Sequence, residues 1–204
     1  MPNLTVSCLL CHRRDLIVIR ESVSQMDAPL RVAFQGEYGA YGEMAAARFG
    51  IPVPCPTFAR VCAAVVEREA NLGVLPIENV IAGPVPEAQA LLRTQPLSVE
   101  TTFWLPIEHC LLGLPGASLS AATHVLSHWQ ALRQCAQFLA RQTRLRPTAV
   151  YDTAGAAKLV RTLGRHNLLA IASRRAAAHY HLDIVAENIA DRTDNATCFA
   201  LFRA

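Results

Sequence analysis

The stretch Gly73-Val-Leu-Pro-Ile-Glu-Asn-Val-Ile-Ala-Gly83-Pro-Val85 decides the fold of this chain. Its apolar residues predict a buried strand at 72–77, which delivers Glu78 and Asn79 to its carboxyl end. Open α/β sheets bind ligands outside the carboxyl ends of their strands. A turn and then a helix at 84–93 are predicted next, because proline at a helix start removes no N–H that the helix needs.

Strand-like and helix-like segments alternate on both sides of this stretch. Strands are predicted at 31–35, 72–77, 123–127, 148–151, 168–172 and 197–202, and an extended stretch interrupted at Pro106 is predicted at 98–112. Helices are predicted at 41–49, 57–69, 84–93, 129–141, 153–163 and 174–180. Alternation of this kind indicates an α/β fold with a largely parallel sheet.

The predicted helix at 129–141 separates an apolar face from a polar one. Its apolar residues follow the i, i+3, i+4 rule and are expected in the core: Ala131, Leu132, Cys135, Phe138 and Leu139. Gln130 and Gln134 lie on another face, in line with Ser127 at the mouth of the helix. We therefore expect these polar side chains to converge.

The composition limits the class of protein. The 204 residues are 52% hydrophobic and 17% charged, which is enough to bury a core. The net charge is +3 and the arginines are spread without clusters, which argues against nucleic-acid binding. No run reaches the roughly 20 apolar residues of a membrane helix. We expect a soluble protein with neither a membrane nor a nucleic-acid partner.

Seven cysteines, an odd number without a secretory signal, indicate reduced thiols in a cytoplasm. Cys8, Cys11 and His12 spell the C-x-x-C-H haem-attachment pattern, which we interpret as accidental because nothing upstream would export the chain. Residues 1–29 do not continue the alternating pattern. We interpret them as a non-core N-terminal extension, with Met26 as an alternative translation start.

The tract Gly36-Glu-Tyr-Gly-Ala-Tyr-Gly42 runs from a predicted strand through glycines into a helix. Such a turn offers backbone N–H donors and the positive end of a helix to an anion. A dinucleotide site is the alternative, but the first two glycines are three apart and no acidic residue between Glu43 and Glu67 could hold a ribose. His179, His181 and His109 could suggest a metal, but two histidines separated by one residue on a helix point apart. We therefore predict no metal site and expect a surface or lobe-interface role for these histidines.

Several tracts together resemble the prephenate dehydratase family, whose members carry P-I-E-N-S-x-x-G-x-V where this chain has 76–85. The resemblance extends, in order and with natural spacing, over about residues 31–204. Its further tracts are Leu105-Pro-Ile-Glu-His109, Ser127-His-Trp-Gln-Ala-Leu132 with Gln134 and Cys135, Asp152-Thr-Ala-Gly-Ala-Ala157, Ala170-Ile-Ala-Ser173, Glu187-Asn-Ile with Asp191, and Asn195-Ala-Thr-Cys-Phe199.

The resemblance implies an α/β fold of two lobes, similar to a type II periplasmic binding protein, with the active site in the interlobe cleft. Lobe one would comprise about 31–105 plus 189–204, and lobe two about 106–188. The implied activity is the cofactor-free conversion of prephenate to phenylpyruvate in phenylalanine biosynthesis, by a homo-oligomer (dimer or tetramer). Family members commonly carry a C-terminal ACT domain that binds phenylalanine. Only five residues follow Phe199, so we expect no feedback control in this chain.

The same resemblance implies the residues of the site. Thr197 would be catalytic, as a donor to the departing hydroxyl, and the substrate-binding set would be Asn79, Ser127, Gln134, Glu78, Gly39 and Phe199. Glu78 is expected to orient its loop rather than to donate a proton. Without the resemblance, Asn79 would be a turn residue, Ser127 a helix cap and Thr197 an ordinary strand residue.

The chain also departs from the family pattern. Residues without hydroxyls stand at Ala40, Gly42, Val80 and Pro84, Trp129 replaces a proline, and Cys198 replaces an arginine. Successive strand residues face opposite sides, so Cys198 should point away from the cleft if Thr197 points into it. Two further interpretations remain open: arogenate as the substrate, and a divergent homologue that binds an aromatic keto or amino acid without turnover.

Overall fold

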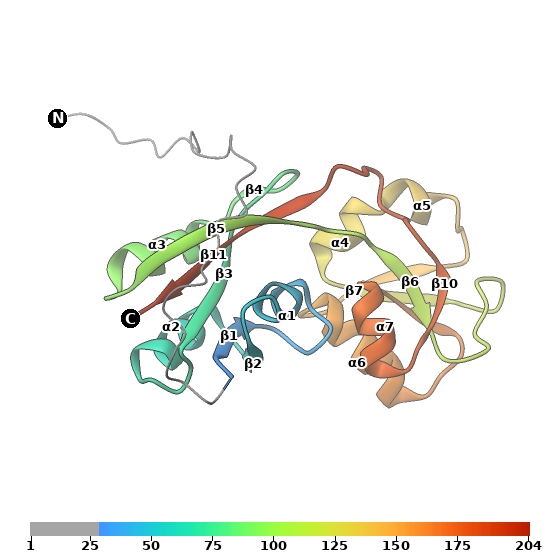
Figure 1. The fold of residues 1–204 in the computed structure, drawn as a ribbon. Coiled ribbons are helices and arrows are strands. Elements are labelled where there is room, and N and C mark those ends of the chain that lie inside the picture. Colours follow the sequence, from blue (N-terminus) through green and yellow to red (C-terminus); the bar gives the residue numbers. More distant parts are fainter. Residues whose placement is uncertain (1–28) are drawn as a thin grey trace.

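The computed structural model describes residues 29–204, which form two lobes, each built on its own sheet (Figure 1). The C-x-x-C-H pattern, Met26 and the extension as far as residue 28 lie outside the described residues. Within residues 29–204, no helix is long and apolar enough to cross a membrane.

The first lobe is built on a sheet with the strand order β2-β1-β3-β11-β5, and the short strand β4 pairs with β3. Its strands are β1 (Arg31–Gln35), β2 (Ile51–Cys55), β3 (Leu72–Asn79), β4 (Gly83–Pro84), β5 (Ser98–Pro106) and β11 (Ala196–Arg203). Its helices are α1 (Tyr41–Ala46), α2 (Phe58–Val66) and α3 (Pro86–Thr94). Alternate strand residues such as Ala33 and Phe34 point to opposite faces. Phe34 therefore packs with α1, and Ala33 packs with α2 and α3.

The second lobe is built on a sheet with the strand order β10-β6-β9-β7-β8. Its strands are β6 (Cys110–Gly113), β7 (His124–Ser127), β8 (Arg146–Ala149), β9 (Leu168–Ala172) and β10 (Asp183–Ala186). Its helices are α4 (Trp129–Gln134), α5 (Ala136–Ala140), α6 (Thr153–Leu163) and α7 (Arg174–Tyr180). Residues of α4 and α5 pack on one face of this sheet, and residues of α6 and α7 on the other. Every residue of the central strand β9 is consequently buried.

Both sheets are mixed, so the prediction of a largely parallel sheet is wrong. β1 is parallel to β2 and β3, and β7 is parallel to β8 and β9. β11 lies antiparallel between β3 and β5, and β6 lies antiparallel between β9 and β10. The reason is that the chain crosses between the lobes twice. The crossings, rather than a covering helix, set the direction of β6 and β11.

Other differences from the predicted elements have local causes. β2, which is absent from the prediction, contains Pro52 and Pro54 and lies at the edge of its sheet, where a missing N–H is tolerated. The short strands β4 and β10 are also absent from the prediction. The predicted helix at 129–141 divides at Cys135, because the φ of −116° and ψ of 23° at this residue are not helical.

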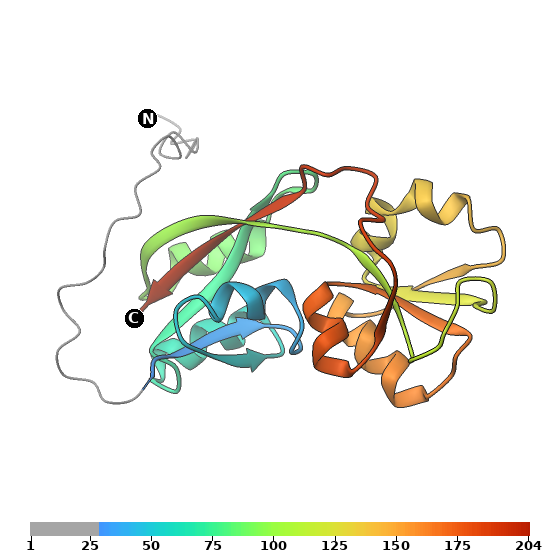
Figure 2. The same cartoon turned by 45° about the vertical axis from the view of Figure 1, so that its right-hand side comes forward.

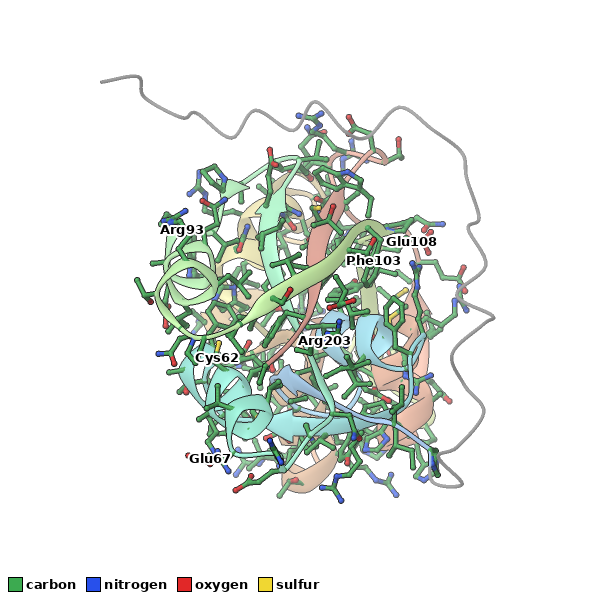
Figure 3. All side chains as sticks on the ribbon, turned by 60° about the vertical axis from the view of Figure 1, so that its left-hand side comes forward. Cys62, Glu67, Arg93, Phe103, Glu108 and Arg203 are labelled. Atoms are coloured by element: carbon green, nitrogen blue, oxygen red, sulfur yellow. The ribbon has the colours of Figure 1, made fainter. Side chains whose placement is uncertain are left out.

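Two segments connect the lobes and run side by side (Figures 1 and 2). After β5 the chain passes Glu108 into the second lobe (Figure 3), and it returns between β10 and β11. The Ile107 N–H donates to the carbonyl of Asn195 at 2.9 Å, and the Ile189 N–H donates to the carbonyl of His109 at 3.1 Å. His109 and Asn195 therefore lie where the two crossovers meet.

The loop between β1 and α1 also joins the lobes. Gly39 has a φ of +90°, and a Cβ at this residue would lie 2.7 Å from the Cα of Ala176 on α7. Ser173 Oγ donates to the carbonyl of Gly39 at 2.6 Å, and Arg175 forms a 2.5 Å salt bridge with Glu43. Glycine is required at position 39 because the backbone is left-handed and no side chain has room.

Candidate active site

A cleft of about 670 Å³ lies between the lobes, within the usual volume range of small-molecule sites. Both lobes and one crossover contribute to its lining, which includes Tyr41, Asn79, Thr197, Phe199, His109, Gln130, Gln134 and Asp152. Residues far apart in the sequence thus share one cavity.

A bulge in β3 turns Asn79 into the cleft. Thr197 pairs with Asn79 and Phe199 pairs with Pro76, so β3 advances three residues where β11 advances two. The extra residue places Pro76 and Asn79 on the same face, although they are an odd number of positions apart. Both line the cleft with Thr197 and Phe199, whereas Cys198 does not. The alternation predicted for Thr197 and Cys198 is confirmed.

The carboxamide of Asn79 holds the hydroxyl of Thr197. Its Oδ1 accepts from the backbone N–H groups of Ile81 at 3.0 Å and Ala82 at 2.9 Å. Its Nδ2 therefore faces the other way and donates to Thr197 Oγ1 at 3.0 Å. A hydroxyl that accepts a hydrogen bond keeps its own proton to donate. Thr197 consequently presents an O–H donor to the cleft.

Asn195 extends this network to Gln134 in the second lobe. Asn79 Nδ2 also donates to Asn195 Oδ1 at 2.9 Å, and Asn195 Nδ2 donates to Gln134 Oε1 at 3.1 Å. The Nε2 atom of His109 lies 2.8 Å from the same Gln134 oxygen. Asn79, Asn195 and His109 are all buried. Since the oxygen of the Gln134 amide is held within the protein, its Nε2 group is the one that remains to donate into the cleft.

The titratable groups of this network are neutral at about pH 7. Burial lowers the pKa of His109, although the hydrogen bond with Gln134 acts in the opposite direction. Burial raises the pKa of Tyr41, whose hydroxyl donates to the carbonyl of Glu108 at 2.5 Å and lies 3.4 Å from His109 Nδ1. Burial also lowers the pKa of His128, another lining residue. The network therefore offers hydrogen bonds rather than charges.

The rest of the cleft lining contains no cationic donor among the described residues. Among the described residues that line the cleft, Asp152 and Glu87 carry charge, and none is Lys or Arg. Asp152 is the N-cap of α6, where its Oδ1 accepts from the Ala154 N–H at 2.8 Å and its Oδ2 from the Glu37 N–H at 3.2 Å. A carboxylate ligand in this cleft would be held by hydroxyl and amide groups.

The sequence model of the family described as prephenate dehydratase matches residues 32–204. The chain belongs to this family. A bifunctional N-acyl-homoserine lactone acylase/prephenate dehydratase of Komagataeibacter europaeus is 41% identical over 171 residues, which cover 82% of this chain and 60% of that protein. The chloroplastic arogenate dehydratase/prephenate dehydratase 1 of Arabidopsis thaliana is 41% identical over 179 residues, which cover 86% and 45%.

A solved prephenate dehydratase has the same fold. The structure from Arthrobacter aurescens, in complex with L-Phe, aligns with a TM-score of 0.78 and 26% identity over 85% of this chain and 60% of that one. The two-lobed α/β fold predicted for a prephenate dehydratase is thus confirmed. The chain spans less than two thirds of the length of each of these three proteins.

The residues predicted for the prephenate dehydratase site separate into two groups. Those that line the cleft are Thr197, Asn79, Gln134 and Phe199. Those outside the lining are Ser127, Glu78 and Gly39. The second group owes its position to contacts within the protein, as their hydrogen bonds and strand pairing demonstrate.

Ser127 is fully buried in β7, and its Oγ donates to the carbonyl of Ile171 on β9 at 2.6 Å. The N–H of Gly39 donates to Glu43 Oε2 at 2.6 Å, so a side chain already occupies this predicted anion donor. Glu78 pairs with Cys198, and as a neighbour of Asn79 on a strand it faces the other side of the sheet.

Sequence reasoning missed Asn195 and Tyr41 as residues of the site, and it gave His109 only a surface or lobe-interface role. His109 and Asn195 lie within tracts that resemble the family, and this was the signal available in the sequence. Their importance depends on the partners of their side chains across the lobe boundary. Such partners cannot be derived from the order of residues along the chain.

The positions that depart from the prephenate dehydratase pattern also fall into two groups, inside and outside the cleft lining. The residues that replace family residues within the cleft lining are Ala40, Gly42, Pro84 and Trp129. Val80 is 44% exposed and lies outside the lining. Its missing hydroxyl therefore removes no donor from the cleft.

Proposed function

We propose that this chain is a prephenate dehydratase, which converts prephenate to phenylpyruvate, CO2 and water. The observation that carries this proposal is the position of the Thr197 hydroxyl in the interlobe cleft. This hydroxyl accepts a hydrogen bond from Asn79 and so keeps its own proton to donate. In this reaction the ring carboxylate leaves as CO2 and its bonding electrons complete the aromatic ring. The C4 hydroxyl takes up one proton, supplied by the solvent, and leaves as water. Membership of the family supports the reaction class.

In this proposal, Thr197 assists the leaving group. The driving force lies in the substrate, whose ring becomes aromatic, so the reaction needs no cofactor. A preorganised donor at the C4 oxygen stabilises the negative charge that develops as the C–O bond breaks. A threonine hydroxyl is weakly acidic, and it therefore acts chiefly by hydrogen bonding rather than by complete proton transfer.

The amides of Gln134 and Gln130 are proposed to hold the substrate carboxylates. The Nε2 group of Gln134 is available because its Oε1 has two partners within the protein. Asn79 is proposed to act through Thr197, since both its oxygen and its amide protons have protein partners. Ser127, Glu78 and Gly39 have no direct substrate contact in this scheme.

Arogenate dehydration is a second candidate, because the charged residues of the lining are carboxylates. Arogenate carries an ammonium group where prephenate carries a keto group. Asp152 and Glu87 would attract this ammonium and repel the net double negative charge of prephenate. The Arabidopsis thaliana relative is named for both substrates.

Steady-state assays with each substrate test the proposal. Purified protein is incubated with prephenate or with arogenate, and the formation of phenylpyruvate or phenylalanine is followed. Turnover of prephenate supports the proposal, and turnover of arogenate alone favours the second candidate. Binding without turnover would identify a divergent binding protein. Cleavage of an N-acyl-homoserine lactone is measured in parallel, because the Komagataeibacter europaeus relative is named for that activity.

We further propose that residues 31–204 form the catalytic domain, with lobes of about 31–105 plus 189–204 and about 106–188. The match of the family model to residues 32–204 supports the domain limits. A homo-oligomer is proposed from the family resemblance, and a cytoplasmic location is proposed from the seven cysteines. Light scattering of the purified chain measures its mass in solution and tests the oligomer.

A further inference from the structure

We infer that His109 and Asn195 are positioning residues that fix the orientation of the two cleft donors, Gln134 and Thr197. The inference rests on the proposed function. Both residues belong to the crossovers between the lobes. His109 and Asn195 each form a hydrogen bond with Gln134, and Asn195 also accepts one from Asn79, which holds Thr197. The hydrogen bonds of the network determine which way each group points.

The backbone fixes the first orientation in the network. The N–H groups of Ile81 and Ala82 are donors by nature, so the Asn79 atom that they contact must be the oxygen. Its Nδ2 then donates to Asn195, whose contacting atom must also be an oxygen. Asn195 is left with its amide nitrogen for Gln134. The Gln134 atom at this contact is therefore an oxygen as well.

The orientation of Gln134 in turn fixes the tautomer of His109. An amide oxygen accepts only, so the imidazole Nε2 that lies 2.8 Å from Gln134 Oε1 must carry the proton. Burial keeps the pKa of His109 low, so its Nδ1 is unprotonated. The Tyr41 hydroxyl lies 3.4 Å from Nδ1 but donates its single proton to the carbonyl of Glu108. The hydrogen bond that holds the ring is therefore the one from Nε2 to Gln134. The imidazole thus orients Gln134 through its Nε2 proton.

Kinetics of His109 variants separate positioning from a general structural role. His109→Leu removes one of the two bonds to Gln134 Oε1 and should raise KM about 3- to 10-fold with little change in kcat. His109→Gln offers an amide N–H near the position of Nε2 and should restore most of the affinity. His166→Leu, which replaces an exposed histidine outside the cleft, is the matched control.

A double-mutant cycle tests whether His109 acts through Gln134. In a Gln134→Ala background, His109→Leu should change KM by less than about twofold. An undiminished effect in that background would overturn the inference. Asn195→Ala should both raise KM and lower kcat, since Asn195 contacts Gln134 and also Asn79, which holds Thr197.

The shape of the pH profile provides a further readout. If His109 only positions Gln134, wild type and His109→Gln should share the same dependence of kcat on pH. The loss of an ionisation from the profile in the glutamine variant would identify His109 as a proton carrier and overturn the inference.

Imidazole 15N NMR spectra test the network without any activity. The signal that is absent from the spectrum of His109→Gln belongs to His109. In the wild type, this signal should show a neutral ring protonated at Nε2 at about pH 7. A proton on Nδ1 would overturn the inference. If wild type turns over neither substrate, the proposed function fails by itself. The tautomer and the Kd of the same variants for phenylpyruvate still decide the inference.

Discussion

Replacement of Thr197 by valine removes the hydroxyl and keeps the shape and β propensity of the side chain. Thr197 is 9% exposed on β11, so little rearrangement is expected. Asn79 Nδ2 retains Asn195 Oδ1 at 2.9 Å and the carbonyl of Ala196 at 3.0 Å as acceptors. Both of its protons therefore keep a partner. We expect the free energy of unfolding to change by less than about 1 kcal/mol.

The effect of Thr197→Val on catalysis should be much larger. The loss of one transition-state donor lowers kcat about 10²- to 10³-fold, and KM should change little. Thr197→Ser keeps a donor on a looser side chain and should retain much more activity. Thr102→Val, at an exposed position of β5, is the matched control. Steady-state kinetics with prephenate and thermal unfolding provide the readouts.

Equal kcat values in wild type and Thr197→Val would refute the catalytic role of the hydroxyl. A rise in KM alone would instead place Thr197 among the substrate-binding residues. If Thr102→Val lost as much activity as Thr197→Val, the loss would reflect damage to the sheet rather than a missing donor.

Two further predictions concern the contact between the lobes. Gly39→Ala should lower the free energy of unfolding by more than about 2 kcal/mol, because its Cβ would lie 2.7 Å from the Cα of Ala176. Gly116 has a φ of +79° and no atom within 4 Å of an added Cβ, so Gly116→Ala measures the backbone strain alone. In urea unfolding, Gly116→Ala should lower the free energy of unfolding by about 1 kcal/mol. Equal losses in the two variants would show that the contact with Ala176 does not matter. For Glu43, burial raises the pKa, but hydrogen bonds from Arg175 and the Gly39 N–H outweigh it and hold the pKa below its ordinary value of 4.5. The stabilisation from the ionised Glu43 is therefore complete above pH 4.5 and is lost as the pH falls through the lowered pKa. The Tm difference between wild type and Glu43→Gln should consequently shrink below pH 4.5. A Tm difference that stays constant with pH would refute this assignment.

Local signals in the sequence predicted the elements whose ends are set locally. α6 begins after Asp152, whose side chain caps the helix, and ends at Gly164, which has a φ of +64°. Both features are visible in the sequence as a capping residue and a terminating glycine. β11 could be predicted as a strand, but its antiparallel position between β3 and β5 depends on where the second crossover returns the chain. No local pattern records that return.

The family resemblance supplied the cleft residues Asn79, Gln134, Thr197 and Phe199, and strand alternation supplied the direction of Thr197. Thr197 and Cys198 were assigned to opposite faces from their succession alone. Ser127 was aligned with Gln134 by helical spacing, but Ser127 belongs to β7 and precedes the helix, so that spacing does not describe its direction. The bulge that turns Asn79 into the cleft arises from pairing between strands more than one hundred residues apart, as the contact of Asn79 with Thr197 illustrates.

The neutral character of the cleft donors suits the proposed chemistry. The ring carboxylate loses its charge as CO2 forms, so a strong cation at this group would stabilise the ground state more than the transition state. Charge develops instead on the C4 oxygen, where a single oriented hydroxyl gains strength as the bond breaks. Amides such as that of Gln134 can hold the substrate without opposing decarboxylation. An active site of this kind depends on orientation rather than on charge, which is why the hydrogen bonds of His109 and Asn195 matter for its function.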